Sequence, residues 1–509
     1  MSRLRSASLC LALPATLIGQ AAWADLTPAQ VWGDWRQYME NMGYTIEAQE
    51  TAEGDDLTVS DVTMRMQMPE DGGAFSMSIG TLNFVQAEDG AVDIRMPEDM
   101  PMTIDIAPEK PEDKPVSMVL NYGQTAPQMT ASGTPDALQY NYTAEAISVK
   151  LTGLTVDGES YGEDRAKFNL TGSGVTSRTE MTVGELRSYS QTGQIESLQY
   201  DVLMDPPDEP ATLALKGGLA QISFDGSGEL PVLDAADDMA AMLRAGLAFQ
   251  GGFSAGAGNT DMKVSDPENG DFGLISTSGG AKLNVAMGPE GLAYDGSQQD
   301  IAVDVTAAEM PFPIKFSMAE TGFNLKLPMK KSEELQDFAF GVTLDQFKMS
   351  DMIWGIFDPT GQLPRDPATL VIDLTGKAKV LFDMMDPEVA TRMGDQEPGE
   401  LHALTVNEVS LKAAGAAFDA SGDITFDNGD METLPGMPKP VGVLDLSLVG
   451  GVALMDKLVS MGLLPQEQAM GARMMMGLFA VPGEGEDSLT SKIEFTEEGA
   501  ILANGQRVK

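Results

Sequence analysis

Residues able to carry out chemistry are scarce in this sequence. The chain holds one His, His402, and one Cys, Cys10, among 509 residues. Zinc enzymes and the Ser–His and Cys–His nucleophile systems depend on imidazole or thiolate groups. The phosphate-binding loops Gly-x-x-x-x-Gly-Lys and Gly-x-Gly-x-x-Gly do not occur. We therefore predict no catalytic residue, no cofactor and no metal site, and expect that the protein is not an enzyme.

Carboxylates are the one abundant reactive group. The 77 Asp and Glu residues leave open a hydrolase of glycan or polymer that works through two carboxyl groups. Sugar-binding clefts use aromatic platforms, and aromatic residues make up only 6% of the chain, so we keep this hydrolase as the alternative. The acidic segment 266–271 resembles a calcium loop but lacks Gly at the sixth position and Glu at the twelfth, so we predict a turn.

Methionine is over-represented, with 34 Met against 19 Phe. A helix predicted at 466–479 carries more apolar side chains than one stripe can bury, and the flexible, polarizable Met side chain suits irregular apolar surfaces. Thioethers also bind Cu(I), but His and Cys partners are missing. Either this helix is ordinary core, or it lines a cavity or patch that binds an apolar molecule. The candidate ligand-lining residues are Met470, Met474, Met475, Met476, Leu478 and Phe479.

The first 24 residues predict a cleaved signal peptide. A basic segment precedes an apolar run at 9–18, and cleavage between Ala24 and Asp25 follows a small-x-small pattern. The run is too short to span a bilayer, and no later window offers about 18 uninterrupted apolar residues. We predict an exported, soluble, periplasmic protein with no transmembrane segment after signal removal. Cys10 leaves with the signal, so the mature chain can form no disulfide.

Alternating apolar residues dominate the mature chain, as at 62–68 and 147–151, between turns rich in Gly, Asp, Asn and Pro. This period of two is typical of half-buried antiparallel strands. Helical spacing appears at 28–42, with Thr27 and Pro28 as the expected N-cap and first helical residue, and at 234–249, 452–463 and 466–479. Ser350 is expected to cap a further short helix that carries Met352 and Phe357. The pattern predicts a mainly β (α+β) fold: large twisted antiparallel sheets with a few amphipathic helices packed on them, including a C-terminal helical hairpin.

Four glycines that follow residue 250 predict a domain boundary (Gly251, Gly252, Gly256 and Gly258). The predicted organisation is a signal peptide at 1–24, an N-terminal β-rich domain at 25–250 and a C-terminal α+β domain at 251–509.

Three stretches of this sequence resemble a known family. They are Val31-Trp32-Gly33-Asp34-Trp35 with Met42-Gly43-Tyr44, the Pro-rich segment 357–370 around Arg365, and the closing segment 501–507. Together they resemble the alphaproteobacterial family called domain of unknown function 2125, whose members have no established activity. The resemblance implies an exported protein of a Gram-negative bacterium and transfers no catalytic residue.

The formal net charge of −45 limits the choice of partner. Nucleic acid and anionic membranes would be repelled at long range, so we predict no nucleic-acid partner. We expect a non-enzymatic envelope protein that binds an apolar ligand such as a lipid, or a protein partner. That function predicts Met and Leu around the largest cavity, whereas the hydrolase alternative predicts two facing carboxylates beside an aromatic wall.

Overall fold

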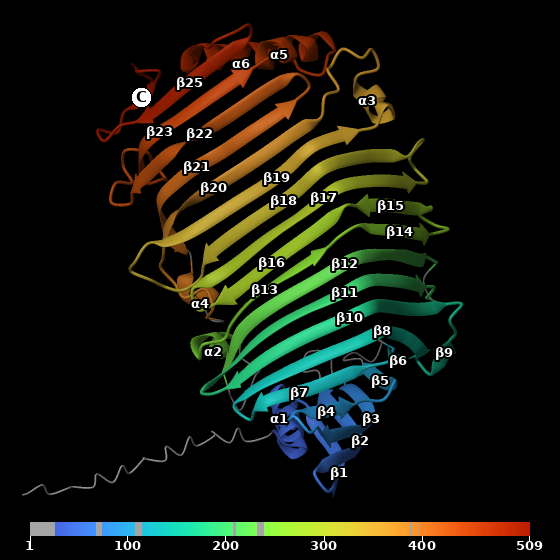
Figure 1. Cartoon of the computed structure of the whole chain (residues 1–509). Helices are drawn as coiled ribbons and strands as arrows, with labels where there is room; N and C mark the ends of the chain where they lie inside the picture. Colours follow the sequence, from blue (N-terminus) through green and yellow to red (C-terminus); the bar gives the residue numbers. More distant parts are fainter. Residues whose placement is uncertain are drawn as a thin grey trace, which may run out of the picture.

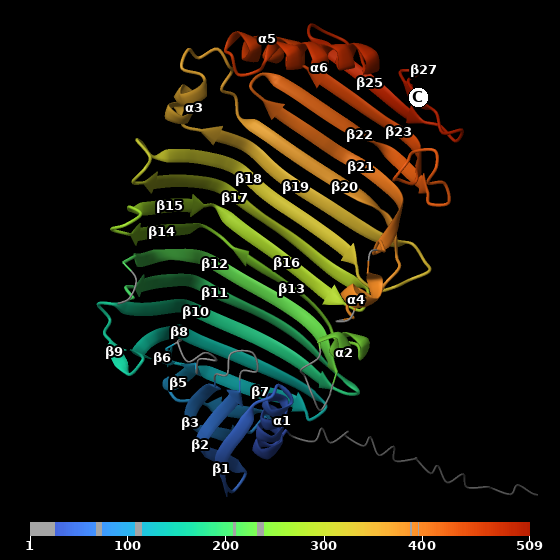
Figure 2. The same ribbon diagram turned by 180° about the vertical axis from the view of Figure 1, so that it is seen from behind.

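The computed structural model describes residues 26–67, 74–106, 114–206, 210–231, 239–386, 389–394 and 396–509. The predicted signal peptide and its cleavage site lie outside these residues. The described chain forms one antiparallel sheet of 27 strands, which twists and curves from the N-terminal helix at one end to the C-terminal helices at the other (Figures 1 and 2). The predicted mainly β fold is confirmed, with one continuous sheet.

The helices are α1 (Pro28–Asn41), α2 (Met239–Arg244), α3 (Asp351–Phe357), α4 (Val389–Met393), α5 (Gly451–Ser460) and α6 (Gln466–Phe479). The strands of the first half are β1 (Thr45–Glu53), β2 (Asp56–Gln67), β3 (Ala74–Gln86), β4 (Val92–Arg95), β5 (Asp99–Ile106), β6 (Val116–Thr125), β7 (Gln128–Thr134), β8 (Ala137–Val156), β9 (Glu159–Tyr161), β10 (Ala166–Val183), β11 (Leu186–Met204) and β12 (Thr212–Pro231). Those of the second half are β13 (Ala248–Ala255), β14 (Gly258–Ser265), β15 (Phe272–Ser278), β16 (Gly280–Gly288), β17 (Gly291–Ala307), β18 (Ile314–Pro328), β19 (Gln336–Met349), β20 (Ala368–Val380), β21 (Gly399–Ala413), β22 (Ala416–Asp427), β23 (Lys439–Val449), β24 (Val481–Pro482), β25 (Ser488–Phe495), β26 (Ile501–Ala503) and β27 (Gln506–Arg507).

Helix α1 begins where the sequence predicted, because Thr27 caps its first turn. The Thr27 hydroxyl accepts a hydrogen bond from the backbone N–H of Gln30, and the Gln30 side chain accepts one from the backbone N–H of Thr27. This reciprocal capping box satisfies donors that a helix leaves unpaired. Pro28 occupies the first helical position, where its missing N–H costs nothing.

The most deeply buried core lies where α1 covers the first strands. Val31 and Trp32 of α1 pack in one cluster with Leu57, Leu82 and Phe84 of β2 and β3. The ring centroids of Trp32 and Phe84 are 6.0 Å apart in a tilted arrangement. Burial of this kind contributes about 1.5–3 kcal/mol per large side chain, so this end of the sheet is a conventional two-layer helix-on-sheet core.

A buried ion pair fastens α1 to strand β11. Arg187 Nη2 donates to Asp34 Oδ1 at 2.8 Å, and both side chains are largely enclosed. The Tyr140 hydroxyl donates to the second Asp34 oxygen at 3.2 Å, and the Arg187 guanidinium lies 5.4 Å from the Tyr38 ring centroid. Burial and the Asp34 carboxylate raise the pKa of the Tyr140 phenol, so this hydroxyl stays a donor at neutral pH.

Strand pairing places apolar residues opposite one another across nearly the whole sheet. Residues paired across neighbouring strands share a face, and one such row, here called the apolar row, crosses the molecule from β2 to β25. Its members are Leu57, Phe84, Ile94, Met129, Tyr142, Ser177, Gly193, Phe224, Phe253, Leu283, Gly296, Phe323, Val342, Ile372, Val409, Ala420, Leu446 and Ser491.

Two further rows lie beside part of the apolar row. Their members stand two or four residues from the apolar row along the strand, and therefore on the same face. In β21 a bulge makes this spacing three residues, from Val409 to Val406. The second row contains Val285, Tyr294, Leu325, Phe340, Leu374, Val406, Gly422, Leu444, Ile493 and Ala503. The third contains Tyr189, Gly228, Phe249, Met287, Leu292 and Leu327. We call this side of the sheet the apolar face.

The opposite side of the same strands is polar. One residue along from the apolar row, the paired residues are Arg178, Thr192, Asp225, Gly252, Asn284, Asp295, Asn324, Gly341, Asp373 and Glu408. Successive side chains of a strand point to opposite faces, so the sheet is amphipathic across its width, with acids and amides on one side and hydrocarbon on the other.

Several long strands contain one internal residue with a left-handed backbone. Gln221 of β12, Asp300 of β17 and Gln346 of β19 have φ angles of 52°, 50° and 50°. In β12 the apolar positions are odd-numbered before this residue, as at Leu215, and even-numbered after it, as at Phe224. The alternation of apolar positions therefore shifts by one residue at the left-handed position.

The sheet continues through the predicted domain boundary. Strand β13 contains residue 250, pairs with β12 and β16, and includes Gly251 and Gly252 among its paired residues. The helix predicted at 234–249 is shorter in the structure: α2 ends at Arg244 because Gly246 has a φ of 104° and β13 begins at Ala248. Residues 234–238 lie outside the described chain. Whether the two halves fold separately stays a prediction.

The predicted C-terminal helical hairpin is present as α5 and α6. Helix α5 ends earlier than residue 463 because Gly462 is left-handed, with φ 74°, and the N–H of Leu463 bonds back to the carbonyl of Leu458. Asp487 accepts hydrogen bonds from the N–H groups of Val452 and Ala453 at the start of α5. Both helices lie beside α3 at one end of the sheet (Figures 1 and 2).

Candidate functional site

The apolar face is uncovered over the central strands. Phe253, Leu283 and Phe323 of the apolar row and Phe340 of the second row are all exposed, with Phe323 at 48%. The described helices make no extensive contact with β13 to β20. Monomeric proteins rarely expose contiguous apolar patches of more than a few hundred Å², so a face of this size indicates a surface that is covered in use.

Aromatic rings on this face lie over glycines of the neighbouring strand. A Cβ added to Gly296 would lie 2.6 Å from the Phe323 ring, and one added to Gly193 would lie 2.1 Å from the Phe224 ring. The glycines therefore leave the space in which the ring sits flat against the backbone. Three more pairs share this arrangement: Gly217 with Tyr200, Gly228 with Tyr189, and Gly376 with Phe338. The result is a low, smooth hydrocarbon surface.

The length of the surface follows from the strand spacing. Between Tyr142 and Ser491 the apolar row crosses thirteen steps from strand to strand, and at about 4.8 Å a step it is about 60 Å long. A bilayer core two acyl chains thick measures about 30 Å. The row is therefore about as long as four acyl chains laid end to end.

A cavity lies at the edge of this surface. Its volume is about 1130 Å³, and five residues of the third row line it: Tyr189, Phe249, Met287, Leu292 and Leu327. Leu335, Lys330 and Lys331 line it as well, from the segment between β18 and β19. One Met and three Leu are among the lining residues, but charged residues such as Glu229, Glu290 and Glu334 line the cavity too, so its lining is mixed. The binding of an apolar ligand stays a prediction.

The Met-rich residues predicted from the sequence lie elsewhere, on α6. Met470, Met474, Met475 and Leu478 are exposed, Met474 at 72%, while Met476 and Phe479 are half-buried. Ala469 is the enclosed residue of this helix. The large apolar face of the sheet was missed by sequence reasoning, although the signal was available in the alternating apolar residues of β12 to β19.

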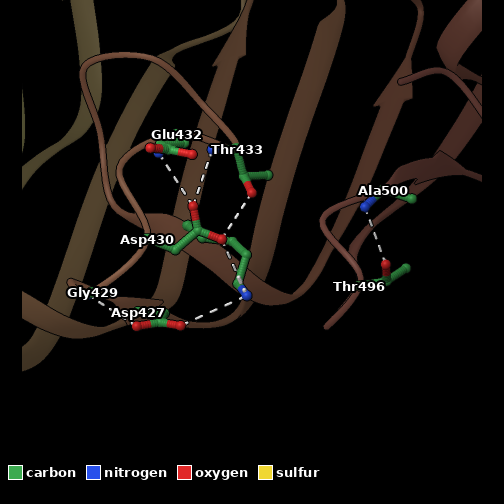
Figure 3. Close-up of polar contacts among 8 residues, drawn as sticks. Asp427, Gly429, Asp430, Glu432, Thr433, Thr496 and Ala500 are labelled. Carbon is green, nitrogen blue, oxygen red and sulfur yellow. Dashed lines mark hydrogen bonds and ion pairs between the residues drawn. The ribbon is translucent and has the colours of Figure 1, made fainter.

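Polar groups with shifted pKa values hold loops in place. Asp430 accepts hydrogen bonds from the backbone of Thr433 and Glu432 and from the Thr433 hydroxyl, at 2.8–3.2 Å (Figure 3). These donors, with Lys439 at 3.5 Å, lower its pKa to about 2. Figure 3 also shows Thr496 accepting from the backbone N–H of Ala500 at the next turn. A carboxylate used in this way fixes a turn and is not poised to exchange protons.

The acidic segment at 266–271 is a turn, as predicted. Asp266 accepts from the backbone N–H groups of Glu268 and Asn269 and from the Asn269 side chain, and these bonds lower its pKa. His402 lies in β21 and contacts Glu400 at 3.2 Å. No group of three or more His, Cys, Asp or Glu side chains placed to hold a metal occurs in the described part of the chain.

Arg365, in the Pro-rich segment, belongs to a rigid turn. It donates to Asp351 of α3 at 2.6 Å. Burial opposes ionisation of the neighbouring Asp358, but hydrogen bonds from the backbone of Leu363, Gln362 and Gly361 outweigh it and lower its pKa. The fully enclosed Asp358 carboxylate accepts these bonds at 2.8 and 2.9 Å from Gln362 and Leu363.

Two Gly-x-Ser-x-Gly segments, 158–162 and 252–256, occur in this sequence. A hydrolase nucleophile elbow requires a sharp turn from a strand into a helix. The first segment lies in the hairpin of β8 and β9, and the second runs along β13 into the connection with β14. Neither leads into a helix, so neither has the geometry of a nucleophile elbow.

Comparison with known proteins adds little. No family model and no curated protein matches the chain. The solved structure of the ferric citrate transporter FecA in its unliganded form aligns with 91% of this chain and 77% of its own, at 10% identity and a TM-score of 0.15. A likeness at that score carries no argument. None of the helices in the described residues has the length and apolar composition needed to cross a membrane.

Proposed function

We propose that this chain is a non-enzymatic envelope protein, exported to the periplasm, whose apolar face binds the hydrocarbon chains of lipids. The observation that carries the proposal is the uncovered apolar row, in which Phe253, Leu283 and Phe323 are exposed, with only Gly296 between the last two. The predicted signal peptide and the resemblance to domain of unknown function 2125 support the location.

Hydrocarbon is the chemistry that fits this surface. Glycines and flat-lying rings make the surface smooth, and the polar atoms of the strand backbones are already paired within the sheet. A protein partner usually binds through a few Trp, Tyr or Arg anchors in pockets, whereas a flexible acyl chain needs only continuous apolar contact. The apolar row is about 60 Å long and is flanked by the second or the third row over most of its length, which suits extended chains.

The hydrolase alternative has less support. It requires a carboxylic acid whose pKa is raised so that it can donate a proton near neutral pH. Among the described residues, every carboxyl group whose pKa clearly departs from the usual range departs downwards: Asp266, Glu333, Asp337, Asp358, Asp430 and Glu498.

A charge placed on the apolar face tests the proposal. We expect Phe323→Asp and Leu283→Asp to abolish binding of a fluorescent fatty acid, because a carboxylate in contact with hydrocarbon loses its hydration. The matched control is Ile275→Asp: Ile275 is equally exposed, at 53%, but it pairs with Asp261 and Asp304 on the polar side of β15.

Fluorescence titration measures the affinity, and mass spectrometry of protein purified from the periplasm identifies any lipid that is retained. All three variants alter exposed side chains, so their melting temperatures should stay close to that of the wild type. Wild-type protein that neither binds the fatty acid nor retains lipid would contradict the proposal. Equal binding by Phe323→Asp and the wild type would contradict the assigned site.

A further inference from the structure

The end of the molecule formed by α3, α5 and α6 carries a second set of exposed apolar side chains. We call it the helical end. Its exposed members are Met352 and Ile356 of α3, Leu463 between α5 and α6, and Met470, Met474, Met475 and Leu478 of α6. They come from three separate segments that lie together at one end of the sheet (Figures 1 and 2). None of them lines the cavity beside the third row.

The exposed apolar side chains of α6 point away from the protein. At 100° per residue, Met470, Met474 and Leu478 fall on one stripe. Ala469, which is enclosed, and Met476 fall on the opposite side. The C-terminal end of α6 is fixed, because the Phe479 carbonyl accepts hydrogen bonds from Ser491 at 2.5 Å and Asn504 at 3.0 Å. The apolar stripe is therefore a fixed outward surface.

The α5–α6 part of the helical end is electrically unlike the rest of the chain. Helix α3 adds one charge, Asp351, which pairs with Arg365. Residues 451–480 contain two acids, Asp456 and Glu467, and two bases, Lys457 and Arg473. Arg473 also pairs with Asp456 across the hairpin. This segment is neutral in a chain with a formal charge of −45. It is a surface that can approach another body without the long-range repulsion that the remainder of the protein would exert.

From these observations we propose that the helical end docks on the surface of a zwitterionic lipid bilayer. The exposed set consists of Met, Ile and Leu and has no Tyr or Arg to anchor a protein partner. Amphipathic helices insert such side chains at the boundary between head groups and acyl chains. With no excess of basic residues, this surface gains nothing from anionic head groups. It therefore favours neutral ones.

The docking proposal is independent of hydrocarbon binding by the sheet, so the two can fail separately. Vesicle flotation is the test, with vesicles of phosphatidylcholine alone and vesicles with added phosphatidylglycerol. We expect the wild-type protein to float with the neutral vesicles and to bind the anionic ones less, with the difference shrinking as added salt screens the charge.

The decisive variant is Met470→Gln/Met474→Gln/Leu478→Gln, which changes only exposed side chains. We expect it to lose vesicle binding and to keep fatty-acid binding, whereas Phe323→Asp should do the reverse. Ile275→Gln is the matched control, because it removes an equally exposed apolar side chain from a strand. Circular dichroism and the melting temperature check that each variant is folded.

Trp354 of α3 reports the geometry of docking. Brominated phosphatidylcholine should quench its fluorescence, and Trp354→Phe should remove the quenched signal, because Trp32 is buried with α1 at the opposite end of the sheet.

Three outcomes would overturn the proposal: no flotation of the wild type, flotation unchanged by the triple variant, or tighter binding to anionic than to neutral vesicles. A dimer in sedimentation that the triple variant abolishes, without vesicle binding, would also overturn it, and would assign the surface to a second copy of this chain.

Discussion

Phe84 and Phe323 occupy the same row of the same sheet in opposite circumstances. Phe84 is fully buried beneath α1, whereas Phe323 is 48% exposed. The residue type and the face of the sheet are the same, and both rings have apolar or Gly neighbours on the adjacent strands. The main difference is that α1 covers Phe84 and no described helix covers Phe323. An apolar row is therefore no evidence of a core until something is found to cover it.

The reach of α1 explains where the core ends. A helix of 14 residues is about 21 Å long, enough to lie across about four strands at 4.8 Å spacing. It covers β1 to β3 and the neighbouring β4 and β7 through Ile94 and Ala131. Helix α6, also of 14 residues, lies at the other end of the sheet, where Ser491 of the apolar row is buried and bonds to the Phe479 carbonyl. The described helices therefore cover the two ends of the apolar row and leave its central strands uncovered.

The largest loss of stability is expected at the covered position, Phe84. Phe84→Ala should destabilise the protein by about 3–5 kcal/mol, because it leaves a cavity between α1 and the sheet. Urea denaturation followed by Trp fluorescence measures the change, since Trp32 and Trp35 both contact the Phe84 ring. A loss below about 1 kcal/mol would show that α1 does not form a tight core with β3.

The Asp34–Arg187 pair tests how firmly α1 is attached. Asp34→Ala leaves the nearly enclosed Arg187 guanidinium without its carboxylate, and removal of one partner of a buried pair costs about 3 kcal/mol. The control is Arg36→Ala, which removes an exposed pair with Glu40 and Glu50 and should cost less than about 1 kcal/mol. Hydrogen exchange of the α1 amides locates the effect, and equal losses for both variants would contradict the attachment.

The local features of the fold could be predicted from sequence. The Thr27 cap, the period of two in the strands and the break between α5 and α6 are encoded by neighbouring residues, and all three are confirmed. Strand order and register are set by contacts between residues far apart in sequence, so the union of all strands in one sheet was not predicted. The left-handed backbone at Gln221 and Gln346 has no signal in residue type.

The candidate site could be predicted only in part. Sequence reasoning found the apolar surface of α6, because a helix with too many Met side chains is visible in a short window. The apolar face of the sheet was missed because each strand alone resembles half of an ordinary sandwich, in which a second layer covers the apolar side. Only the assembled sheet reveals that no second layer lies over Leu283 and Phe323.

The smallest loss of stability is expected at the uncovered position, Phe323. Phe323→Ala removes the same atoms as Phe84→Ala but from an uncovered position, so its cost should stay within about 1 kcal/mol, the size of a cross-strand pair. Part of that cost comes from exposing Gly296, over which the ring lies. Urea denaturation compares the stability of the two variants directly. Fatty-acid titration should show weaker binding for Phe323→Ala and unchanged binding for Phe84→Ala. If Phe323→Ala instead costs as much as Phe84→Ala, the row is covered in the folded protein. The apolar face would then be core, and the surface assigned to hydrocarbon would not be free to bind it.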